Sequence, residues 1–197
     1  MSGQDRPLVV GLGGTTRPGS STERALAMAL RAAEEAGCRT QLFDGTALTR
    51  LPLYVPGQHD RTVEEQQFVA AVRAASGLVI ASPGYHGSVS GLVKNAIDLI
   101  EETAQDERAY LSDLPVGLIA TAYGWAATGS TIATLRAIVH ALRGWPTPFA
   151  AAINSATCTF DEAGGCADPK VAGQIALVGR QVALGVQRSQ AGHGGSV

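Results

Sequence analysis

The sequence contains few cysteines, and this scarcity excludes several kinds of protein. Its three cysteines, Cys38, Cys158 and Cys166, include no pair in CxxC spacing. A disulfide framework or a zinc site would need more of them, so no metal is predicted and a reducing compartment is favoured. The first seven residues also lack the apolar region of a signal peptide, and we expect a cytoplasmic protein. Cys158 and Cys166 are near enough in sequence to approach each other, although we expect two free thiols.

Charged residues are also scarce, at 16% of the chain, with a net charge of -2. A nucleic-acid partner is not predicted, because neutralising phosphates requires a cluster of lysine and arginine side chains. Residues 114–135 carry no charge and are long enough to cross a bilayer. Pro115, Gly124 and Gly129 interrupt this run, which reads as a strand, a loop and the start of a helix. No membrane partner is therefore predicted.

Short apolar runs alternate with amphipathic segments along the chain. The apolar runs are typical of buried strands, and the segments between them have helical spacing and N-cap signals. The expected strands are residues 8–12, 40–43, 78–81, 116–122 and 148–153. The expected helices are residues 21–36 and 131–143, with others beginning after Thr62, Ser90 and Asp168. This alternation predicts an α/β fold, a doubly wound parallel sheet covered on both faces. We assign residues 1–188 to a single domain and residues 189–197 to a disordered, glycine-rich tail.

In such a sheet, ligands bind beyond the carboxyl ends of the strands, where the strand order reverses. For a flavodoxin-like sheet of five strands in the order 2-1-3-4-5, this point lies between the first and third strands. The loop after the first strand, residues 13–20, combines glycines, hydroxyls and Arg17 at a helix start, which suits a phosphate. It lacks the lysine of a P-loop, and Thr16 leaves its GxGxxG pattern incomplete. An ordinary strand-to-helix turn with a serine N-cap explains this loop equally well.

Two further loops carry aromatic side chains beside glycines. After the third strand, Tyr85 and His86 offer flat surfaces and hydrogen-bonding groups that suit an aromatic ligand. The alternative is that Tyr85 packs beneath the loop and His86 lies in solvent, since no partners for a catalytic triad are spaced near it. After the fourth strand, residues 123–129 would complete a three-sided pocket. Trp125 in this loop has two open roles, stacking on a ring or contacting another subunit.

Three segments of the chain resemble the NADPH-dependent FMN reductase family. Residues 14–22 (GTTRPGSST) are similar to its phosphate loop, Gly-Ser-x-Arg-x-x-Ser-x-Asn. Residues 83–98 (PGYHGSVSGLVKNAID) are similar to its segment of Pro-x-Tyr followed by Gly-x-x-Lys-Asn, and this is the most specific match. Residues 51–54 (LPLY) resemble another recurrent loop of the family. The likeness runs from the first strand to the last helix.

The resemblance implies a set of cofactor-binding residues. The FMN phosphate is expected at Thr15, Arg17, Ser20, Ser21 and Thr22. The flavin ring and ribityl chain are expected along Pro83, Gly84, Tyr85, His86 and Gly87, with Tyr123 and Gly124 at the pyrimidine edge. The chain departs from the family pattern with Thr15 for serine, Thr22 for asparagine, Gly84 for a commonly acidic residue and His86 for asparagine. The last two departures lie at the ring end and bear on substrate preference more than on flavin binding.

The resemblance also implies an activity, the passage of hydride from NADPH or NADH to FMN and then to an acceptor. The cofactor carries this chemistry, so no obligatory acid or base is expected. We favour a flavin reductase that supplies reduced FMN to a partner monooxygenase. The alternatives are a reductase of quinones, azo compounds or metal ions with tightly bound FMN, and a flavodoxin-type electron carrier. A homodimer or homotetramer is expected from the resemblance.

Overall fold

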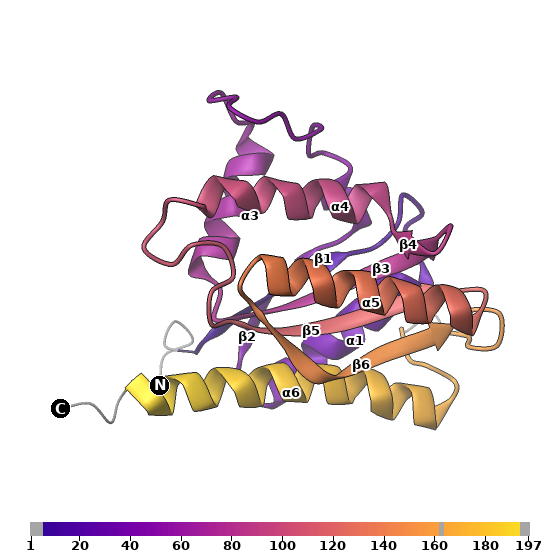
Figure 1. The fold of residues 1–197 in the computed structure, drawn as a ribbon. Helices are drawn as coiled ribbons and strands as arrows, with labels where there is room; N and C mark the ends of the chain where they lie inside the picture. Colours follow the sequence, from indigo (N-terminus) through magenta and orange to yellow (C-terminus); the bar gives the residue numbers. More distant parts are fainter. Residues whose placement is uncertain (1–5, 162–163, 194–197) are drawn as a thin grey trace.

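The computed structural model of the chain describes residues 6–161 and 164–193. Its central sheet runs in the order β2-β1-β3-β5-β6, and these strands are all parallel (Figure 1). They comprise β1 (Leu8–Gly13), β2 (Arg39–Phe43), β3 (Gly77–Tyr85), β5 (Pro115–Ala122) and β6 (Trp145–Asn154). A further short strand, β4 (Ser88–Val89), lies off this path and pairs with β3. With β4 set aside, the order is the predicted 2-1-3-4-5, and the flavodoxin-like α/β fold is confirmed.

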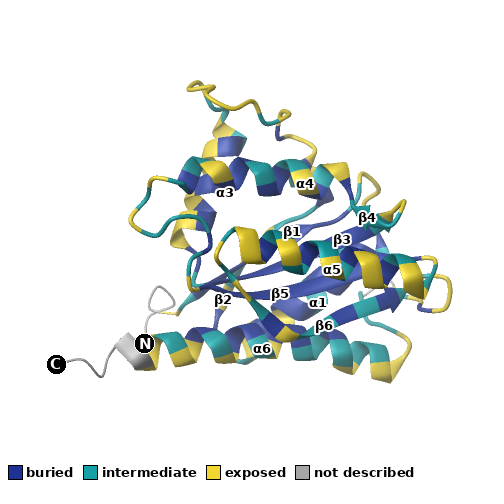
Figure 2. Cartoon of the chain, in the orientation of Figure 1, coloured by how far each residue is buried: buried dark blue, intermediate teal, exposed yellow. Residues whose placement is uncertain are grey.

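Helices cover both faces of the sheet and create two separate cores (Figures 1 and 2). One face packs against α1 (Ser21–Glu35) and α6 (Pro169–His193). The other face packs against α3 (Val63–Ala74), α4 (Gly91–Asp98), the 3-10 turn η1 (Leu99–Thr103) and α5 (Trp125–Ala141). Every residue of β1 and β5 is buried, as expected for strands covered on both sides.

Apart from that of α5, the predicted helix starts are confirmed, because they depend on local hydrogen bonds. Thr62 and Glu65 form a capping box, in which the Glu65 amide donates to Thr62 Oγ1 at 3.2 Å and the Thr62 amide to Glu65 Oε2 at 2.7 Å. Ser90 caps α4 by accepting from the Val93 amide at 3.3 Å. Such caps leave fewer unpaired amides in the first turn of a helix.

Helix α5 begins at Trp125, earlier than the predicted start at residue 131, so the prediction of a loop through residue 129 was wrong. The expected glycine-rich loop contracts to Tyr123 and Gly124, with Gly124 as the N-cap. Glycine and hydroxyl residues weaken the helical signal in isolation. In the fold the hydroxyls of Thr128 and Thr131 instead donate to carbonyls of the same helix, and both side chains are buried. Packing therefore overrides the local preference.

Three other features were not expected from the sequence. Residues 45–48 form the short helix α2 (Gly45–Leu48), capped by Asp44, within a stretch predicted to be irregular. Strand β4 forms a hairpin with the end of β3. Helix α6 continues to His193, so residues 189–193 of the predicted tail are helical, and residues 194–197 lie outside the described residues. The five positions after the buried Val186 contain no glycine, so the glycine-rich composition of the tail does not apply to the last turns of the helix.

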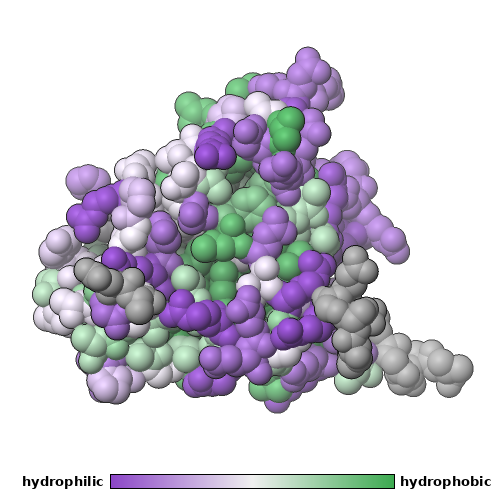
Figure 3. Space-filling model, turned by 180° about the vertical axis from the view of Figure 1, so that it is seen from behind, coloured by the Kyte–Doolittle hydropathy of each residue, from purple (hydrophilic) through white to green (hydrophobic). Residues whose placement is uncertain are grey.

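Figure 3 shows the face opposite that of Figure 1, where an apolar area lies within a largely hydrophilic surface. Three large side chains near the carboxyl ends of β3 and β5 are also exposed, namely Tyr85, Tyr123 and Trp125. Among the residues that the structure describes, no helix has the length and apolar character needed to cross a membrane.

Candidate functional site

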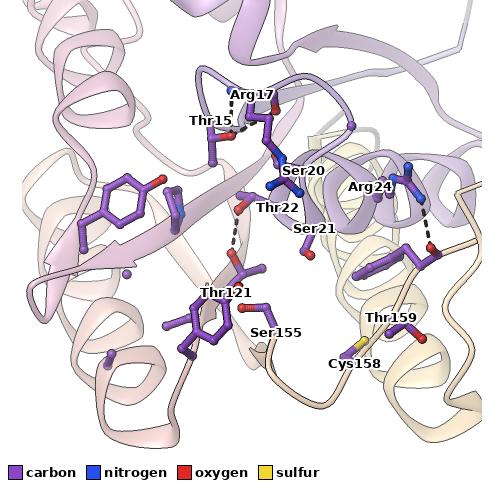
Figure 4. A pocket seen from close by; sticks show the side chains of 18 of the residues that line it. Thr15, Arg17, Ser20, Ser21, Thr22, Arg24, Thr121, Ser155, Cys158 and Thr159 are labelled. Carbon is purple, nitrogen blue, oxygen red and sulfur yellow. Dashed lines mark hydrogen bonds between the residues drawn. The ribbon is translucent and has the colours of Figure 1, made fainter.

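A cavity of about 700 Å³ lies beyond the carboxyl ends of β1, β3, β5 and β6 (Figure 4). This is the edge where doubly wound sheets bind ligands, and the volume is typical of cofactor sites. The lining residues are Thr15, Arg17, Gly19, Ser20, Ser21, Thr22, Arg24, Pro83, Gly84, Tyr85, Thr121, Ala122, Tyr123, Gly124, Ala127, Ser155, Cys158, Thr159 and Phe160. The fold thus brings together all but two of the residues predicted to contact the cofactor, the exceptions being His86 and Gly87.

The loop after β1 is held in a defined shape before α1 begins. A side chain at Gly13 would place its Cβ 2.1 Å from the carbonyl oxygen of Ala81, so only glycine permits β1 to end so close to β3. Thr15 Oγ1 accepts a hydrogen bond from the Arg17 amide and donates one to the Arg17 carbonyl, both at 3.1 Å. The Thr15 hydroxyl therefore shapes the loop from within and retains acceptor capacity only.

The first turn of α1 forms one wall of the cavity. Ser20 is the N-cap and accepts from the Glu23 amide at 3.3 Å. The amides of Ser21 and Thr22 precede the first possible intrahelical partner, and both residues line the cavity. Together with the partial positive charge of a helix N-terminus, these amides suit an anion.

Two arginines near this wall have different environments. Arg17 is exposed, and its guanidinium points toward Ser20 and into the cavity (Figure 4). Arg24 instead donates from Nη1 to the carbonyl oxygens of Phe160, at 3.1 Å, and Asp161. Arg24 thereby fastens the loop after β6 to α1, which leaves Arg17 as the arginine that points into the open cavity.

The loop after β3 turns back on itself as a tight hairpin. Its two central residues, His86 and Gly87, have φ angles of 52° and 82°, the left-handed conformation of a two-residue hairpin turn. This turn carries His86 into solvent, and neither residue lines the cavity. His86 and Gly87, which were expected beside the flavin, therefore do not line this cavity as Tyr85 does, because the hairpin projects its tip outward.

Gly84 lies where β3 meets the first turns of α5. A Cβ at this position would be 2.7 Å from Thr131 Oγ1 and 3.0 Å from the carbonyl oxygen of Ala127. The close packing of α5 thus accounts for glycine where the family commonly has an acidic residue. Because Gly124 caps α5 without a side-chain hydrogen bond, the first amides of α5 add polar groups to this side of the cavity.

Sequence reasoning missed the fourth side of the cavity, which the loop after β6 supplies. Its contribution consists of Ser155, Cys158, Thr159 and Phe160. A polar stretch directly after an apolar strand was the available signal. However, β6 is the edge strand of the sheet, so only the tertiary structure shows that its loop reaches back across β5 toward α1. Gly19, Arg24, Thr121, Ala122 and Ala127 were missed as well.

Two of the three cysteines meet within this loop. The sulfur atoms of Cys158 and Cys166 are 3.1 Å apart, and both are free thiols. Burial raises the pKa of the Cys158 thiol to about 12, with further contributions from the hydrogen bond to Cys166. Cys38 is buried elsewhere in the core. Among the described residues, no group of three or more histidine, cysteine or acidic side chains is arranged to hold a metal ion.

Two of the recognisable sequence segments contact each other outside the cavity. Asn95 Oδ1 accepts from the Tyr54 amide at 2.8 Å, and Asn95 Nδ2 donates to the Pro52 carbonyl at 2.8 Å. The side-chain amide of Asn95 on α4 thus provides hydrogen-bond partners for the Tyr54 amide and the Pro52 carbonyl, which lie in the loop that precedes α3. The asparagine in the Lys-Asn pair therefore has a structural role in this chain, and the neighbouring Lys94 forms an ion pair with Asp98 at 2.6 Å.

Comparison with known proteins agrees with this arrangement. The model of the family described as NADPH-dependent FMN reductase matches residues 7–157. An FMN-dependent NADPH-azoreductase of Staphylococcus haemolyticus is 39% identical over 83 residues, which cover 42% of this chain and 40% of that protein. An NADPH azoreductase of a Bacillus species is 33% identical over 85 residues, covering 43% of this chain and 44% of the relative. The matches thus span only about two fifths of the length of these curated relatives.

Solved structures share the fold at low sequence identity. An oxidoreductase of Corynebacterium diphtheriae has a TM-score of 0.76 at 17% identity, covering 93% of this chain and 98% of that one. A flavoenzyme NAD(P)H:(acceptor) oxidoreductase of Paracoccus denitrificans has a TM-score of 0.70 at 18% identity, covering 92% and 98%. A WrbA-like flavodoxin of Agrobacterium tumefaciens has a TM-score of 0.66 at 15% identity, with the same coverage.

Proposed function

The chain belongs to the NADPH-dependent FMN reductase family, and from this premise we propose that it binds FMN in the cavity and uses NADPH or NADH to reduce an acceptor. The observation that supports the proposal is that one cavity has a cationic, amide-lined end and an end lined by backbone and aromatic side chains. One end has the amides of α1 and Arg17, and the other end has backbone of the loops after β3 and β5 with two tyrosines. This combination fits a ligand that has a phosphate at one end and a flat ring at the other.

The phosphate of FMN is assigned to the first turn of α1. The amides of Ser21 and Thr22 would donate to its oxygens, and Arg17 would add a cation able to form paired hydrogen bonds. The Ser20 hydroxyl keeps a proton to donate while it accepts from the Glu23 amide. Thr15 contributes by holding the loop in shape.

The flavin ring is assigned to the opposite end, between Gly84 and the start of α5. Pro83 and Gly84 present backbone without bulky side chains, while Tyr85 and Tyr123 flank the opening. FMN, when bound, supplies the two-electron redox chemistry, and the residues of the chain bind it, orient it and leave one side open to a second substrate. No side chain in the lining is required as an acid or base by this assignment.

FMN titration and nicotinamide oxidation test this proposal. We expect the purified protein to bind FMN in preference to riboflavin, because the phosphate end provides most of the charged contacts. We also expect NADPH or NADH absorbance to fall faster with protein and FMN than with FMN alone. The proposal is wrong if FMN does not bind, or if neither nicotinamide is oxidised above the rate seen with free FMN.

The acceptor is a separate question, and the relatives favour one class. Two similar proteins carry the name azoreductase, and the exposed aromatic rings of Tyr85 and Tyr123 at the opening suit a flat aromatic acceptor. We therefore propose azo compounds or quinones as acceptors reduced beside bound FMN. Activity with an azo dye and with a quinone, measured with FMN limiting, tests this assignment.

Release of reduced FMN to a partner monooxygenase is the second candidate. It is supported by the exposure of Arg17, because a solvent-exposed cation holds a phosphate less firmly than a buried one. Gel filtration of the FMN complex distinguishes the two candidates. FMN that stays with the protein favours reduction in place, whereas FMN that separates favours exchange. A homodimer or homotetramer remains our proposal for the assembly, to be measured by light scattering.

A further inference from the structure

The loop between β6 and α6 places two thiols in direct contact. Cys158 Sγ and Cys166 Sγ are 3.1 Å apart, and a disulfide bond measures about 2.05 Å. The two sulfurs therefore need to approach by only about 1 Å to become bonded. Cys158 also lines the cavity, whereas Cys166 is not among the lining residues and is partly exposed.

A frame of backbone hydrogen bonds holds the two segments together. Phe160 and Cys166 form an antiparallel bridge, and the Ala167 amide donates to the Thr159 carbonyl at 3.0 Å. Arg24 anchors the same segment to α1 through the Phe160 carbonyl at 3.1 Å. These backbone hydrogen bonds hold residues 158–160 beside residues 166–167, so the two sulfurs are near each other because of the backbone and not only because of their side-chain rotamers.

Packing alone provides a weaker explanation for this pair. Cysteine behaves as a small apolar residue, and Cys158 does contribute to the core beside α1 and α6. Cys38 has this purely structural role in the same core, without a described contact to another sulfur. Cys158 and Cys166 differ from Cys38 because their sulfur atoms are in contact at the wall of a cavity. Two adjacent thiols can be oxidised together to a disulfide.

We propose that Cys158 and Cys166 form a redox-active dithiol, a modification site that a hydroperoxide oxidises to an intramolecular disulfide. Cys166 is the more exposed of the two residues and would meet the peroxide first. The Cys166 sulfur attacks one peroxide oxygen, the O–O bond breaks, and the proton of the Cys166 thiol goes to the departing oxygen. The products are a sulfenic acid at Cys166 and an alcohol, or water where the peroxide is hydrogen peroxide.

The second step uses the proximity of Cys158. Its sulfur attacks the sulfur of the sulfenic acid, the S–O bond breaks, and the Cys158 proton leaves with the hydroxyl group as water. The two thiols thus lose two electrons and two protons, and the peroxide is reduced to alcohol and water. The disulfide ties together the ends of the segment that carries Thr159 and Phe160, both of which line the cavity. Reduction by an external dithiol restores the two thiols.

Peptide mass measurement tests this proposal on the intact chain without added flavin, so its outcome is separate from that of the proposed function. The protein is treated with hydrogen peroxide, denatured, alkylated and digested with trypsin. Both cysteines fall in one peptide, residues 144–170, and Cys38 falls in another, residues 32–39. We expect the first peptide to appear two hydrogens lighter and unalkylated, and to accept two labels after dithiothreitol. The Cys38 peptide should carry its label throughout.

Two variants complete the design. Cys38→Ser should form the disulfide as the wild-type protein does, whereas Cys166→Ser should leave Cys158 available for alkylation after peroxide treatment. The proposal is overturned if wild-type residues 144–170 take two labels after peroxide. It is equally overturned if this peptide gains oxygen instead of losing hydrogen, or if the disulfide joins two molecules on a non-reducing gel.

Discussion

The hydroxyl oxygens of Thr22 and Thr121 lie 2.6 Å apart, which joins the first turn of α1 to the end of β5 (Figure 4). Both residues are almost fully buried, at 1% and 4% exposure. A phosphate contact from the Thr22 side chain, as the family resemblance implies, would therefore compete with this bond. The backbone amide of Thr22 remains the group best placed for the phosphate, and the hydroxyl pair positions that amide relative to the sheet.

Replacing either threonine with valine should destabilise the protein by about 1–3 kcal/mol, because the remaining hydroxyl is left buried without its partner. The double variant Thr22→Val, Thr121→Val should cost less than the sum of the two single changes, since no orphaned hydroxyl remains. Urea unfolding measures these differences. Thr46→Val on the exposed side of α2 is the control, expected within about 0.5 kcal/mol of wild type. Additive costs would show that the two hydroxyls are not coupled.

Arg17→Ala should weaken FMN binding and leave riboflavin binding unchanged, because riboflavin lacks the phosphate. A hydrogen bond to a charged group contributes about 1.5–3 kcal/mol, which corresponds to roughly a tenfold to hundredfold loss of affinity. Quenching of flavin fluorescence measures both affinities. Arg188→Ala, an exposed change on α6 away from the cavity, should affect neither ligand. Equal losses for FMN and riboflavin would place Arg17 away from the phosphate.

Two glycine-to-alanine substitutions, one beside α5 and one within it, should change the free energy of unfolding in opposite directions. Gly84→Ala places a Cβ 2.7 Å from Thr131 Oγ1, so α5 must move, at a cost of about 1–3 kcal/mol. Gly129→Ala meets no atom within 4 Å on the exposed side of α5, and the better helix former should stabilise the protein by up to about 1 kcal/mol. Thermal unfolding compares the variants. If Gly84→Ala left the unfolding temperature unchanged, α5 could shift far enough to accommodate the added methyl group.

Asn95→Ala should release the loop before α3, because the Tyr54 amide and the Pro52 carbonyl both lose their side-chain partner. Two hydrogen bonds of this kind contribute roughly 1–3 kcal/mol together. Limited proteolysis with trypsin should cut faster at Arg50 or Arg61, which flank the loop. Lys94→Ala removes an exposed ion pair instead, and the cleavage rate in this loop should then remain that of the wild type.

The Cys158 thiol should make stability depend on pH in the alkaline range. Its pKa rises from the ordinary 9.0 to about 12, through burial first and the contact with Cys166 second. In the unfolded chain the thiol ionises near pH 9.0, whereas the folded protein keeps the proton until about pH 12. Stability from this group is therefore complete below pH 9.0 and is lost as the pH rises toward 12. Urea midpoints of the wild type should fall more steeply across this range than those of Cys158→Ser.

Much of the fold follows from signals that lie close together in the sequence. The capping box of Thr62 and Glu65 and the cap at Ser90 each depend on residues within three positions of one another. The apolar runs and the helical spacing predict the alternating elements for the same reason, whereas the strand order was that expected of a flavodoxin-like sheet. The phosphate loop is also local, because a short turn followed directly by a helix determines where its amides lie.

The sequence by itself therefore determined the α/β fold, the loops at the sheet edge and the residues of α1 that suit a phosphate. Only the tertiary structure decided which side chains share the cavity. Arg24 and Phe160 meet across 136 positions, and Thr22 and Thr121 across 99, so no local pattern could pair them. The position of His86 in solvent depended on a hairpin, and the contact of Cys158 with Cys166 depended on the path of the loop after β6. The reason is physical, since local hydrogen bonding builds the elements and long-range packing sets the distances between them.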